Sequence, residues 1–592
     1  MKNRAWSLLV AGLLAGLGGC GLSLRDKTAC ATTKDCLNGY SCVDKQCVSG
    51  NIAARDAGPR QSQDGGVIDA GSRDSGPRSV RDAGTDARPD AGSLGCGTIL
   101  HVSQARPLIW EQPTGASWSA AYPDLAPTLQ LADEMVARCG HAEVWVAQGR
   151  YLPSVADKSV AFVLKSHVEI YGGFAGTETS RAERDWHAHE TVLSGDFNFD
   201  DGSSGGFSAH DQDNSFAVVQ GGSARQPIDS SAVLDGFVIT GASTRPLAST
   251  ASGAIYLDHG APTLRNLVIT DSFSPVCCAG DGVPHLEDIV IAANAGTSLS
   301  ALDTCAPSLE RVVMVGNTSE SLGGGGVVLA QQQSPTLTNM LIAGNWCGST
   351  GVLGSMSSPK LDHVIVAGNF SWAEGGHSSV PDGLVGFSTG PKLAITNSII
   401  WGNSPNNGAS GVADWDHSCT QGRAASGSNV DCSTKSPFRA YTALTGTWSA
   451  RSTYDEQAVQ TVLHDDTAHF APGALAGLLV QFGPDPTGLG PSTIPTNGLC
   501  WGYIVSNTDK EVRVWGFFQE AAQAGDVYTI RDLRPATDAQ TIDQAAPGGI
   551  ATDILGQSRL DVPGTTGDVS TADIGAYEYV PGGPAICLAK CP

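Results

Sequence analysis

The hydrophobic positions between residues 262 and 403 follow one pattern that recurs along the chain. Each copy opens with Pro, has apolar residues two, five and seven positions later, and ends with Asn or Ser ten positions later. Apolar residues two positions apart indicate strands, and copies that start 22 to 32 residues apart indicate a solenoid. The pattern therefore predicts a coil of stacked parallel strands. Five copies are regular and a sixth is looser; they begin at Pro262, Pro284, Pro307, Pro335, Pro359 and Pro391.

An Asn closes most of these copies and forms a second regular column. The amide of Asn bonds neighbouring backbone groups, and Asn tolerates the left-handed backbone that tight bends need. We expect these residues to stack at one repeated bend as a structural ladder. The column consists of Asn294, Asn317, Asn345, Asn369 and Asn403.

The sequence on either side of the repeat predicts a cap and a separate module. Residues 126–138 place Leu129, Ala132 and Met135 on one face of a helix. A helix suits the first coil as a cap, because an open β edge invites association. Beyond the repeat, alternating apolar residues at 473–482, 503–516 and 525–532 predict the strands of an inserted or appended β-rich module.

The first twenty residues have the features of an export signal. Lys2 and Arg4 precede the apolar run Leu8 to Leu17, which is too short for a permanent membrane helix. The segment that ends in Gly18-Gly19-Cys20 resembles the bacterial lipoprotein signal, in which the chain is cut before the Cys and the Cys is lipidated. The resemblance implies a lipid anchor, such as palmitate, on Cys20 and an outer-membrane lipoprotein exposed at the cell surface. An ordinary cleaved signal with a coincidental Cys is the alternative.

Export makes the sixteen cysteines interpretable as disulfides, because oxidising compartments permit them. Four of them crowd into one short segment without a core-sized apolar run, which indicates a mini-domain held by two bridges; a zinc site is the alternative. These four are Cys30, Cys36, Cys42 and Cys47. Proximity favours three further pairs, Cys96 with Cys139, Cys419 with Cys432 and Cys587 with Cys591, while Cys277, Cys278, Cys305 and Cys347 fall on adjacent coils.

Several segments resemble those of a known group of proteins. EVWVAQGRYLP (143–153), EIYGGFAGTETSRAERDW (169–186) and LDGFVITGA (234–242) resemble the opening segment of secreted right-handed parallel β-helix repeat proteins. Those proteins are related in fold to pectate lyases and polymorphic outer-membrane proteins. ATDILGQSRL (551–560) and ADIGAYEY (572–579) resemble their final segment. The resemblance implies a mainly β chain, a right-handed parallel β-helix whose N-terminal cap contains one helix, with a β-rich C-terminal module.

Composition and repeats together divide the chain into regions. Asp-Ala-Gly recurs in a segment with few apolar residues, which cannot offset the entropy of ordering and is expected to be a disordered tether. The expected regions are a signal peptide (1–19), a lipid anchor with the Cys-rich mini-domain (20–50), the tether (51–95), the cap with the first coils (96–192), the β-helix repeats (193–410), the β-rich module (411–535) and the closing segment (536–592).

The sharpest polar cluster is the acidic turn at 196–202. Oxygen ligands at alternate positions before a Gly are what a hard cation such as Ca²⁺ requires. Asp196, Asn198, Asp200 and Asp201 are therefore candidate calcium ligands, although the pattern is more typical of a solvated acidic turn, and no cofactor is assigned. The spacing departs from the EF-hand loop, because Gly202 comes one position later and no flanking helices are expected.

No residue pattern establishes a catalytic site, so none is assigned. Paired carboxylates serve glycosidases, but nothing in the sequence fixes their separation, and a Gly-His-Gly turn and an Arg-Ile-Lys strand typical of pectinases are absent. Aromatic side chains either stack on sugars or belong to the core. The aromatic candidates are Tyr256, Phe370, Trp401, Trp415, Trp501 and Trp515.

The net charge of −24 argues against nucleic acid as a partner, because nucleic-acid binding requires Lys and Arg to neutralise phosphates. We therefore expect a surface-tethered lipoprotein that contacts the membrane through its lipid. Its expected function is non-enzymatic binding or adhesion to polysaccharide or another surface component. An envelope polysaccharide lyase or glycoside hydrolase is the alternative.

Overall fold

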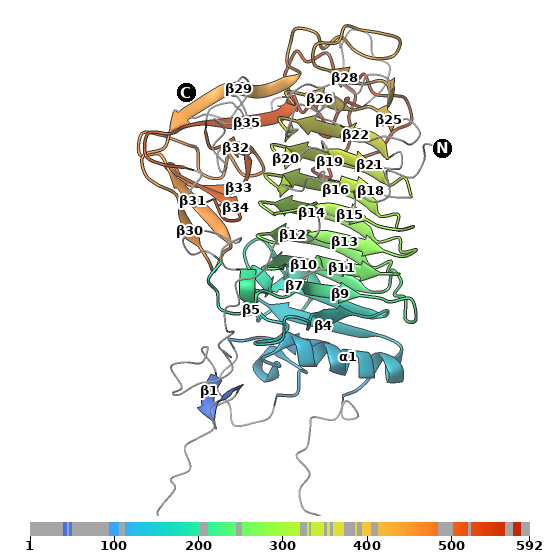
Figure 1. Cartoon of the computed structure of the whole chain (residues 1–592), viewed down its shortest axis with the longest axis vertical. Helices are drawn as coiled ribbons and strands as arrows, with labels where there is room; N and C mark the ends of the chain where they lie inside the picture. Colours follow the sequence, from blue (N-terminus) through green and yellow to red (C-terminus); the bar gives the residue numbers. More distant parts are fainter. Residues whose placement is uncertain are drawn as a thin grey trace, which may run out of the picture. The chain divides into compact units, whose positions relative to one another are not determined.

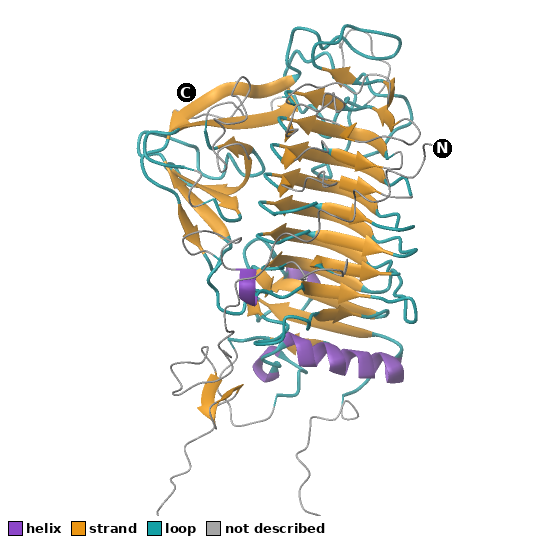
Figure 2. Ribbon diagram, viewed as in Figure 1, coloured by secondary structure: helices purple, strands orange, loops and turns teal. Residues whose placement is uncertain are grey.

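The chain divides into two compact units, Met1–Ala83 and Gly84–Pro592. In the first unit, β1 (Tyr40–Val43) pairs antiparallel with β2 (Gln46–Ser49), and Cys42 lies opposite Cys47 in the register. The expected anchor at Cys20 and the cysteines Cys30, Cys36, Cys587 and Cys591 lie outside the described residues. The computed structural model (Figures 1 and 2) describes residues 40–43, 46–49, 94–105, 113–201, 211–243, 252–319, 328–330, 333–347, 352–355, 359–371, 385–386, 393–403, 413–483, 501–518, 522–562 and 572–581.

The second unit contains a right-handed parallel β-helix; the repeat predicted its stacked parallel strands, and the resemblance implied its hand. Its strands stack coil upon coil in sheets of 15, 8 and 3 strands. The main path of the largest sheet is β3 (Leu100–Val102), β4 (Ala142–Ala147), β7 (Val168–Phe174), β10 (Val233–Thr240), β12 (Thr263–Thr270), β14 (His285–Ala292), β16 (Ser308–Val315), β19 (Thr336–Ala343), β22 (Lys360–Ala367), β25 (Leu393–Thr396) and β27 (Ala413–Asp416). Beside it run β5 (Gly149–Tyr151), β8 (Thr191–Ser194), β26 (Ile399–Trp401) and β28 (Cys419–Thr420).

The two smaller sheets complete the walls of the β-helix. The 8-stranded sheet contains β6 (Phe162–Leu164), β9 (Ala217–Gly221), β11 (Gly253–Asp258), β13 (Val276–Ala279), β15 (Leu299–Ala301), β18 (Val328–Ala330), β21 (Leu353–Ser355) and β24 (Val385–Gly386). The 3-stranded sheet contains β17 (Thr318–Ser319), β20 (Trp346–Cys347) and β23 (Phe370–Ser371). A disulfide between Cys278 and Cys305 joins two neighbouring coils.

The repeated apolar positions line the interior of the β-helix. In β12, Leu264, Leu267 and Ile269 are fully buried, and each pairs in register with the equivalent residue of the next coil. The columns continue through β14, β16, β19 and β22. Complete burial of one such side chain contributes about 2 kcal/mol, so the stacked columns form the main core.

A left-handed residue bends each long strand at its fourth position, a feature that the sequence analysis did not predict. The ladder pairs skip this position, since Arg265 pairs with Glu287 and Leu267 with Ile289. The bend divides each long strand into two halves, and the outward-facing side chains of the two halves have different surroundings. The residues with positive φ in this column are Asn266 (52°), Asp288 (56°), Arg311 (54°), Asn339 (49°), His363 (56°) and Asn397 (52°).

The Asn column forms a continuous hydrogen-bonded ladder inside the wall. The side-chain Nδ2 of each Asn donates to Oδ1 of the next, over 3.0 Å from Asn294 to Asn317 and 2.8 Å from Asn345 to Asn369. The left-handed position is not the Asn itself but the residue before it, such as Gly344 with a φ of 58°. Asn is therefore present for its amide rather than for its backbone freedom.

One α-helix covers the N-terminal end of the β-helix. α1 spans Leu125–Cys139 and buries Leu125, Leu129, Ala132 and Met135 against the first coil. It ends at Gly140, which has a left-handed backbone, and the Cys96–Cys139 disulfide fastens this end. Among the described residues no helix combines the length and apolarity needed to cross a bilayer. Short 3-10 helices lie at Trp118–Ala120, Arg181–Glu183 and Asp211–Asp213.

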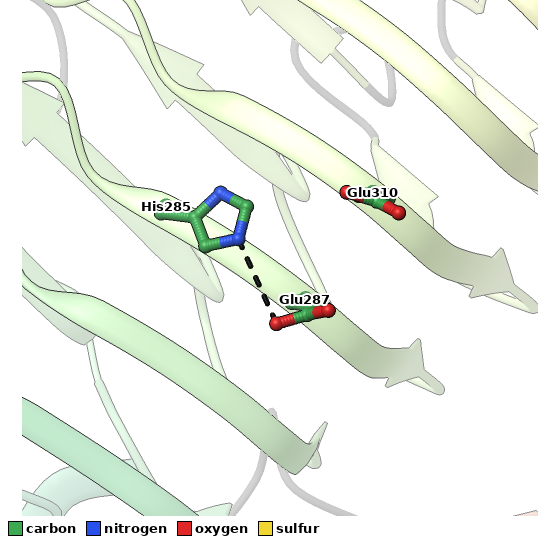
Figure 3. Close-up of side chains that lie close together, drawn as sticks. All are labelled: His285, Glu287 and Glu310. Carbon is green, nitrogen blue, oxygen red and sulfur yellow. Dashed lines mark ion pairs between the residues drawn. The ribbon is translucent and has the colours of Figure 1, made fainter. Parts of the chain in front are cut away.

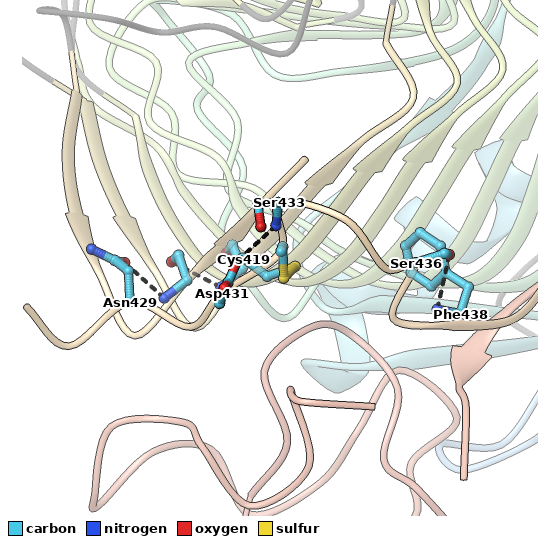
Figure 4. Close-up of a disulfide and its surroundings, with 9 residues drawn as sticks. Cys419, Asn429, Asp431, Ser433, Ser436 and Phe438 are labelled. Carbon is cyan, nitrogen blue, oxygen red and sulfur yellow. Dashed lines mark hydrogen bonds between the residues drawn. A yellow bond between two sulfur atoms is a disulfide. The ribbon is translucent and has the colours of Figure 1, made fainter. Parts of the chain in front are cut away.

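The C-terminal end of the β-helix extends further than the sequence predicted. β27 pairs parallel with β25, and β28 pairs parallel with β26, so residues 413–420 form a coil rather than part of the module expected from residue 411. The Cys419–Cys432 disulfide ties the following loop to this coil (Figure 4). In that loop Asn429 Oδ1 accepts the backbone N–H of Ser418, and Asp431 Oδ1 accepts that of Ser433.

The β-rich module begins at Phe438 and forms an antiparallel sheet. Its own core contains Trp448, Phe470, Phe482 and Tyr528. The expected strands are present, with shifted ends. In sheet order they are β29 (Phe438–Thr447), β35 (Val527–Pro535), β32 (Leu479–Gln481), β33 (Trp501–Asn507), β34 (Glu511–Trp515), β31 (Gln460–His464) and β30 (Thr453–Asp455).

The module and the closing segment pack along one side of the β-helix (Figure 1). After the bend in each strand, the outward-facing residue is apolar, as in Val268, Leu341 and Ile365. These residues share a hydrophobic cluster with Trp501 and other residues from beyond the repeat. The outer wall is thus a second core, which holds the C-terminal third of the chain in place.

Candidate functional site

The acidic turn predicted at 196–202 brings three carboxylates together. Ligand oxygens of Asp196, Asp200 and Asp213 all lie within 4.8 Å of one another. Asp196 Oδ1 accepts the backbone N–H groups of Asn198 and Phe199, at 3.1 and 2.8 Å, and Asp213 Oδ2 accepts that of Asn198 at 3.0 Å. These backbone donors hold the carboxylates in place around a small volume. An acidic cluster that is able to hold a metal ion is therefore present.

Two buried oxygens next to this triad have no hydrogen-bond donor among the described residues. Asp201 follows Asp200, and Asn214 follows Asp213; the Asn214 amide Nδ2 donates to Asp201 Oδ2 over 2.8 Å. The other oxygens of the pair, Asp201 Oδ1 and Asn214 Oδ1, are buried without a partner in the described part of the chain. Asp201 is only 7% exposed and Asn214 is fully buried. Because burial raises the pKa of Asp201 to about 9, its carboxyl keeps a proton at neutral pH, which is a donor for this buried pair.

The carboxyl groups of the turn lie close to one another and to Arg150. Burial raises the pKa of Asp201 to about 9, and repulsion from Asp196 adds to this shift. Burial also raises the pKa of Asp196, while Arg150 opposes that rise. The guanidinium of Arg150 lies over the Phe199 ring and donates to Ser194 Oγ over 3.2 Å.

The same arginine connects the turn to the β-rich module. Arg150 Nη1 donates to the backbone oxygen of Glu456 over 2.8 Å. Close by in the fold, Asp271 at the end of β12 accepts the Tyr454 hydroxyl at 2.7 Å and the Phe517 N–H at 2.8 Å. Asp271 is buried, and burial raises its pKa to about 6. The first coils and the module therefore meet through polar contacts at this place.

A second candidate region, the polar strip, lies on the outward face of the strand halves that precede the bend. Two columns of polar side chains run in register along it. Arg265 is 36% exposed, His285 38% and Glu310 33%. The strip consists of Thr263, Arg265, His285, Glu287, Ser308, Glu310, Thr336, Thr338, Lys360 and Asp362.

Charges concentrate on the strip between β14 and β16. His285 and Glu287 stand on one strand and Glu310 on its neighbour, all on the same face (Figure 3), and their ligand atoms lie within 4.8 Å of one another. Arg311 binds Glu310 at 2.6 Å, Asp288 at 2.7 Å and also Glu287. These hydrogen bonds raise the pKa of Arg311, with that to Asp288 contributing most. Two of the three candidate ligands, Glu287 and Glu310, are therefore already paired with a guanidinium.

A third acidic group lies in the closing segment and was missed in the sequence. Asp543, Asp573 and Glu578 are buried with ligand oxygens within 4.8 Å of one another. Burial, helped by repulsion from Glu578, raises the pKa of Asp573 to about 8. Backbone N–H groups and Arg559 bind these carboxylates, and Arg559 also donates to Asn339 Oδ1 over 2.8 Å. Arg559 thereby fastens the closing segment to the β-helix; the only signal in the sequence was the pair of acids, Asp573 and Glu578, in ADIGAYEY.

The aromatic residues considered as sugar platforms are mostly in the interior. Exposure does not exceed 9% for Tyr256, Phe370, Trp401, Trp501 and Trp515. Trp415 is half-buried against the main core, with Arg423 over its ring at 5.1 Å. Trp501 and Trp515 pack between the module and the β-helix because the outer wall is apolar there. The interpretation of these buried aromatics as sugar platforms is therefore wrong.

Comparisons with known proteins concern the fold. No family model matches the sequence, and no curated protein is detectably similar to it. The crystal structure of pectate lyase Pel9A is 11% identical with a TM-score of 0.36, over 82% of this chain and 98% of the lyase. The tailspike protein gp49 from Acinetobacter baumannii bacteriophage Fri1, a capsular polysaccharide depolymerase, is 10% identical with a TM-score of 0.21, over 75% of this chain and 88% of its own. The Dettilon tailspike protein (gp208) is 10% identical with a TM-score of 0.22, over 74% and 94%.

Proposed function

We propose that this chain is a cell-surface lipoprotein whose β-helix binds a polysaccharide without cleaving it. The observation that supports this proposal is the polar strip. Its side chains form two columns that run along the β-helix, and each coil contributes one residue to each column. Successive coils lie about 4.8 Å apart. The columns therefore offer a linear glycan polar groups at regular intervals along its length.

The charge of the chain favours an uncharged glycan. The net charge of −24 repels acidic polymers at long range. Charged members of the strip are paired with neighbouring residues of opposite charge, Arg265 with the buried Asp235, and Glu287 and Glu310 with Arg311. Carboxylates and guanidinium groups bind pairs of hydroxyl groups through two hydrogen bonds, which suits a neutral sugar.

The arrangement of the carboxyl groups favours binding over hydrolysis or elimination. A general acid must carry a proton at working pH, whereas the ion pairs of Glu287 and Glu310 with Arg311 require ionised carboxylates. The acids with strongly raised pKa, Asp201 at about 9 and Asp573 at about 8, are buried and do not meet a polymer. These two carboxyl groups are therefore not available to protonate a glycosidic oxygen.

The proposal includes a lipid anchor on Cys20, which can be tested directly. Because the signal ends in Gly18-Gly19-Cys20, we expect fatty acid to be attached to Cys20. Metabolic labelling with palmitate should mark the wild type and leave Cys20→Ala unlabelled. Labelling of the Cys20→Ala chain would contradict the anchor.

Calcium is the ion that we propose for the acidic turn. The donors there are carboxylate and amide oxygens, and Ca²⁺ binds six to eight such ligands. Asp196, Asp200 and Asp213 would contribute carboxylates, whereas Asp201, which the sequence also suggested, is not part of this group of close ligand atoms. The side chain of Asn198, which the sequence suggested as a ligand, stays a prediction.

A panel of neutral and acidic glycans tests the binding proposal. Full-length chain in mild detergent should bind a neutral glycan, and Glu287→Ala combined with Glu310→Ala should weaken binding about tenfold, or about 1.4 kcal/mol. The matched control is Glu134→Ala, an exposed acid on α1, which should bind like the wild type. Equal binding by the double variant would exclude the strip as the binding surface.

A further inference from the structure

We infer that a preformed pocket at the C-terminal end of the polar strip holds the terminal sugar unit of a neutral glycan that lies along the strip. The inference rests on the glycan binding proposed above and adds a subsite for the end of the glycan. The pocket has a volume of about 310 Å³, at the lower end of the range for small-ligand sites, which suits one sugar unit rather than a length of chain. Its polar and aromatic lining includes Asp414 and Trp415 of β27, Thr420 of β28, and Arg423, Ser426 and Asn429 of the following loop.

The pocket lies where one column of the strip ends. The outward column that contains Lys360 continues in register through Ala394 to Asp414. Asp414 is exposed and belongs to β27, the last strand on the main path of the 15-stranded sheet. A glycan that follows the strip towards the C-terminal coils therefore meets the pocket with its end.

Covalent and hydrogen bonds hold the walls of the pocket in place. The Cys419–Cys432 disulfide ties the loop to β28 (Figure 4). In the loop, Asn429 Oδ1 accepts the backbone N–H of Ser418 at 2.9 Å, and Asn429 Nδ2 donates to the backbone oxygen of Trp415 at 3.4 Å. A site that is already ordered avoids the entropic cost of ordering its loops when a ligand binds. The pocket is therefore built before a ligand arrives.

Arg423 distinguishes the pocket from an ordinary hollow in the surface. Its Cζ lies over the Trp415 ring, 5.1 Å from the ring centre, and within the described part of the chain no carboxylate binds its guanidinium. Arg311, by contrast, is paired with two acids of the strip. Stacking on the ring orients the guanidinium, and its N–H groups stay available in the planar fork that suits a pair of oxygen atoms.

The mixture of groups in the pocket favours a neutral sugar. Arg423 supplies donors, Asp414 is an acceptor, and the hydroxyl groups of Thr420 and Ser426 both donate and accept. The hydroxyl groups of a sugar also do both, and the half-buried Trp415 offers apolar surface to the C–H face of the ring. A sugar acid would meet the carboxylate of Asp414 as well as the guanidinium.

The length of an oligosaccharide separates the pocket from the rest of the strip. Glu310 in β16 lies four strands from β27 in the sheet, roughly 19 Å at about 4.8 Å per coil, which a trisaccharide held in the pocket does not span. The probes are trisaccharides and decasaccharides of glucose, mannose, galactose and N-acetylglucosamine, with oligogalacturonates as the acidic comparison. Binding to the full-length chain in mild detergent is measured by ligand-observed NMR, which detects weak ligands.

Arg423→Gln should weaken the binding of both lengths about tenfold, because both place their end in the pocket. Glu287→Ala combined with Glu310→Ala should weaken the decasaccharide alone. The matched control is Arg225→Gln, at an exposed arginine after β9, which should bind both lengths like the wild type. Arg423 is exposed as well, so its replacement should leave the melting temperature unchanged.

Each failure has a distinct signature. Equal trisaccharide affinity in wild type and Arg423→Gln would overturn the subsite, while a loss of decasaccharide binding in the Glu287 and Glu310 double variant would still support the proposed function. Tighter binding of oligogalacturonates than of every neutral probe would overturn the assignment to a neutral sugar. If no neutral oligosaccharide binds the wild type, the proposed function is wrong and the subsite with it.

Discussion

At the scale of single residues, the amide of each ladder Asn satisfies several buried groups at once. Asn345 Oδ1 accepts both the backbone N–H and the side-chain Nδ2 of Asn317, each at 3.0 Å. Asn345 Nδ2 donates to the Met314 oxygen at 3.0 Å. Since Asn345 is only 1% exposed, water does not replace these partners.

Replacing Asn345 should therefore be costly. Asn345→Ala leaves buried donors and an acceptor unpaired and should lower the free energy of unfolding by about 3 kcal/mol. Urea denaturation followed by circular dichroism measures the change. Thr338→Ala on the outward face of β19 is the control and should stay within about 0.5 kcal/mol of the wild type. A loss below about 1 kcal/mol in Asn345→Ala would contradict the structural role of the ladder.

Glu190 makes the contact between the first coils and the module sensitive to pH. Burial, with repulsion from Asp455, raises its pKa from 4.5 to about 7, and Gln460 Nε2 donates to Glu190 Oε1 at 3.0 Å. Arg513 opposes this rise. A carboxyl with a raised folded-state pKa binds its proton more tightly in the folded chain. Its contribution to stability is therefore complete below pH 4.5 and disappears as the pH rises through about 7.

The expected result is a smaller pH dependence in Glu190→Gln. Wild type should lose more thermal stability than this variant between pH 5 and pH 8, because the neutral Gln does not titrate. Melting temperatures across this range measure the difference. Parallel curves for the two proteins would show that Glu190 is solvated in the folded chain.

At the scale of elements, the bend at the fourth position of each strand decides what the strand does. Before the bend, polar residues face outward, as Arg265 does in β12; after it, Val268 faces the module. The interior columns were predictable because Leu264, Leu267 and Ile269 recur at fixed spacing. The second apolar column, Val268, Val290, Val313, Leu341 and Ile365, was present in the sequence as well. Its meaning was not predictable, because an outward apolar residue signals docking only when its partner is known.

Dependence on distant contacts also explains why the module was expected to begin at residue 411 and why the burial of the aromatic residues was not predicted. Residues 413–420 pair with the preceding coil although they lack the leading Pro and the full apolar spacing. Trp501 lies on the antiparallel sheet, far in sequence from the wall that buries it. Its burial depends on a contact that no local pattern encodes.

The glycine that precedes Asn345 in the ladder, Gly344, contacts Trp501 of the module and allows a test of how the module is held. Gly344 has a φ of 58°, and an added Cβ would lie 2.2 Å from Trp501 Cγ. Gly344→Ala should combine the strain of a left-handed Ala, about 1–2 kcal/mol, with displacement of the module. Gly427 has a similar φ of 63° but open space around it, so Gly427→Ala isolates the backbone strain.

The measurement is limited proteolysis together with urea denaturation. Gly344→Ala should lose more stability than Gly427→Ala and expose the module to protease at lower concentrations of urea. Equal losses in the two variants would mean that Trp501 does not hold the module to the wall.

At the scale of the whole second unit, a rigid β-helix presents one polar side and covers the other. The cap, the coils and their fold class were predictable, because each coil repeats the same short pattern. The acidic turn was predictable from Asp196, Asp200 and Asp201, whereas Asp213 and Asn214 join it only through the return of the chain. The carboxylates of the closing segment and the Arg311 pairs were not predictable, since each joins residues from different coils or segments.

Binding without cleavage is the central claim, and product analysis tests it most directly. The full-length chain is incubated with the neutral polysaccharide that it binds best, with and without calcium, and the polymer is then analysed by size-exclusion chromatography and for new reducing or unsaturated ends. We predict that the polymer remains bound, with its length distribution unchanged. Shortened chains with new ends, lost on Asp196→Ala or Asp200→Ala, would contradict the claim and identify an enzyme.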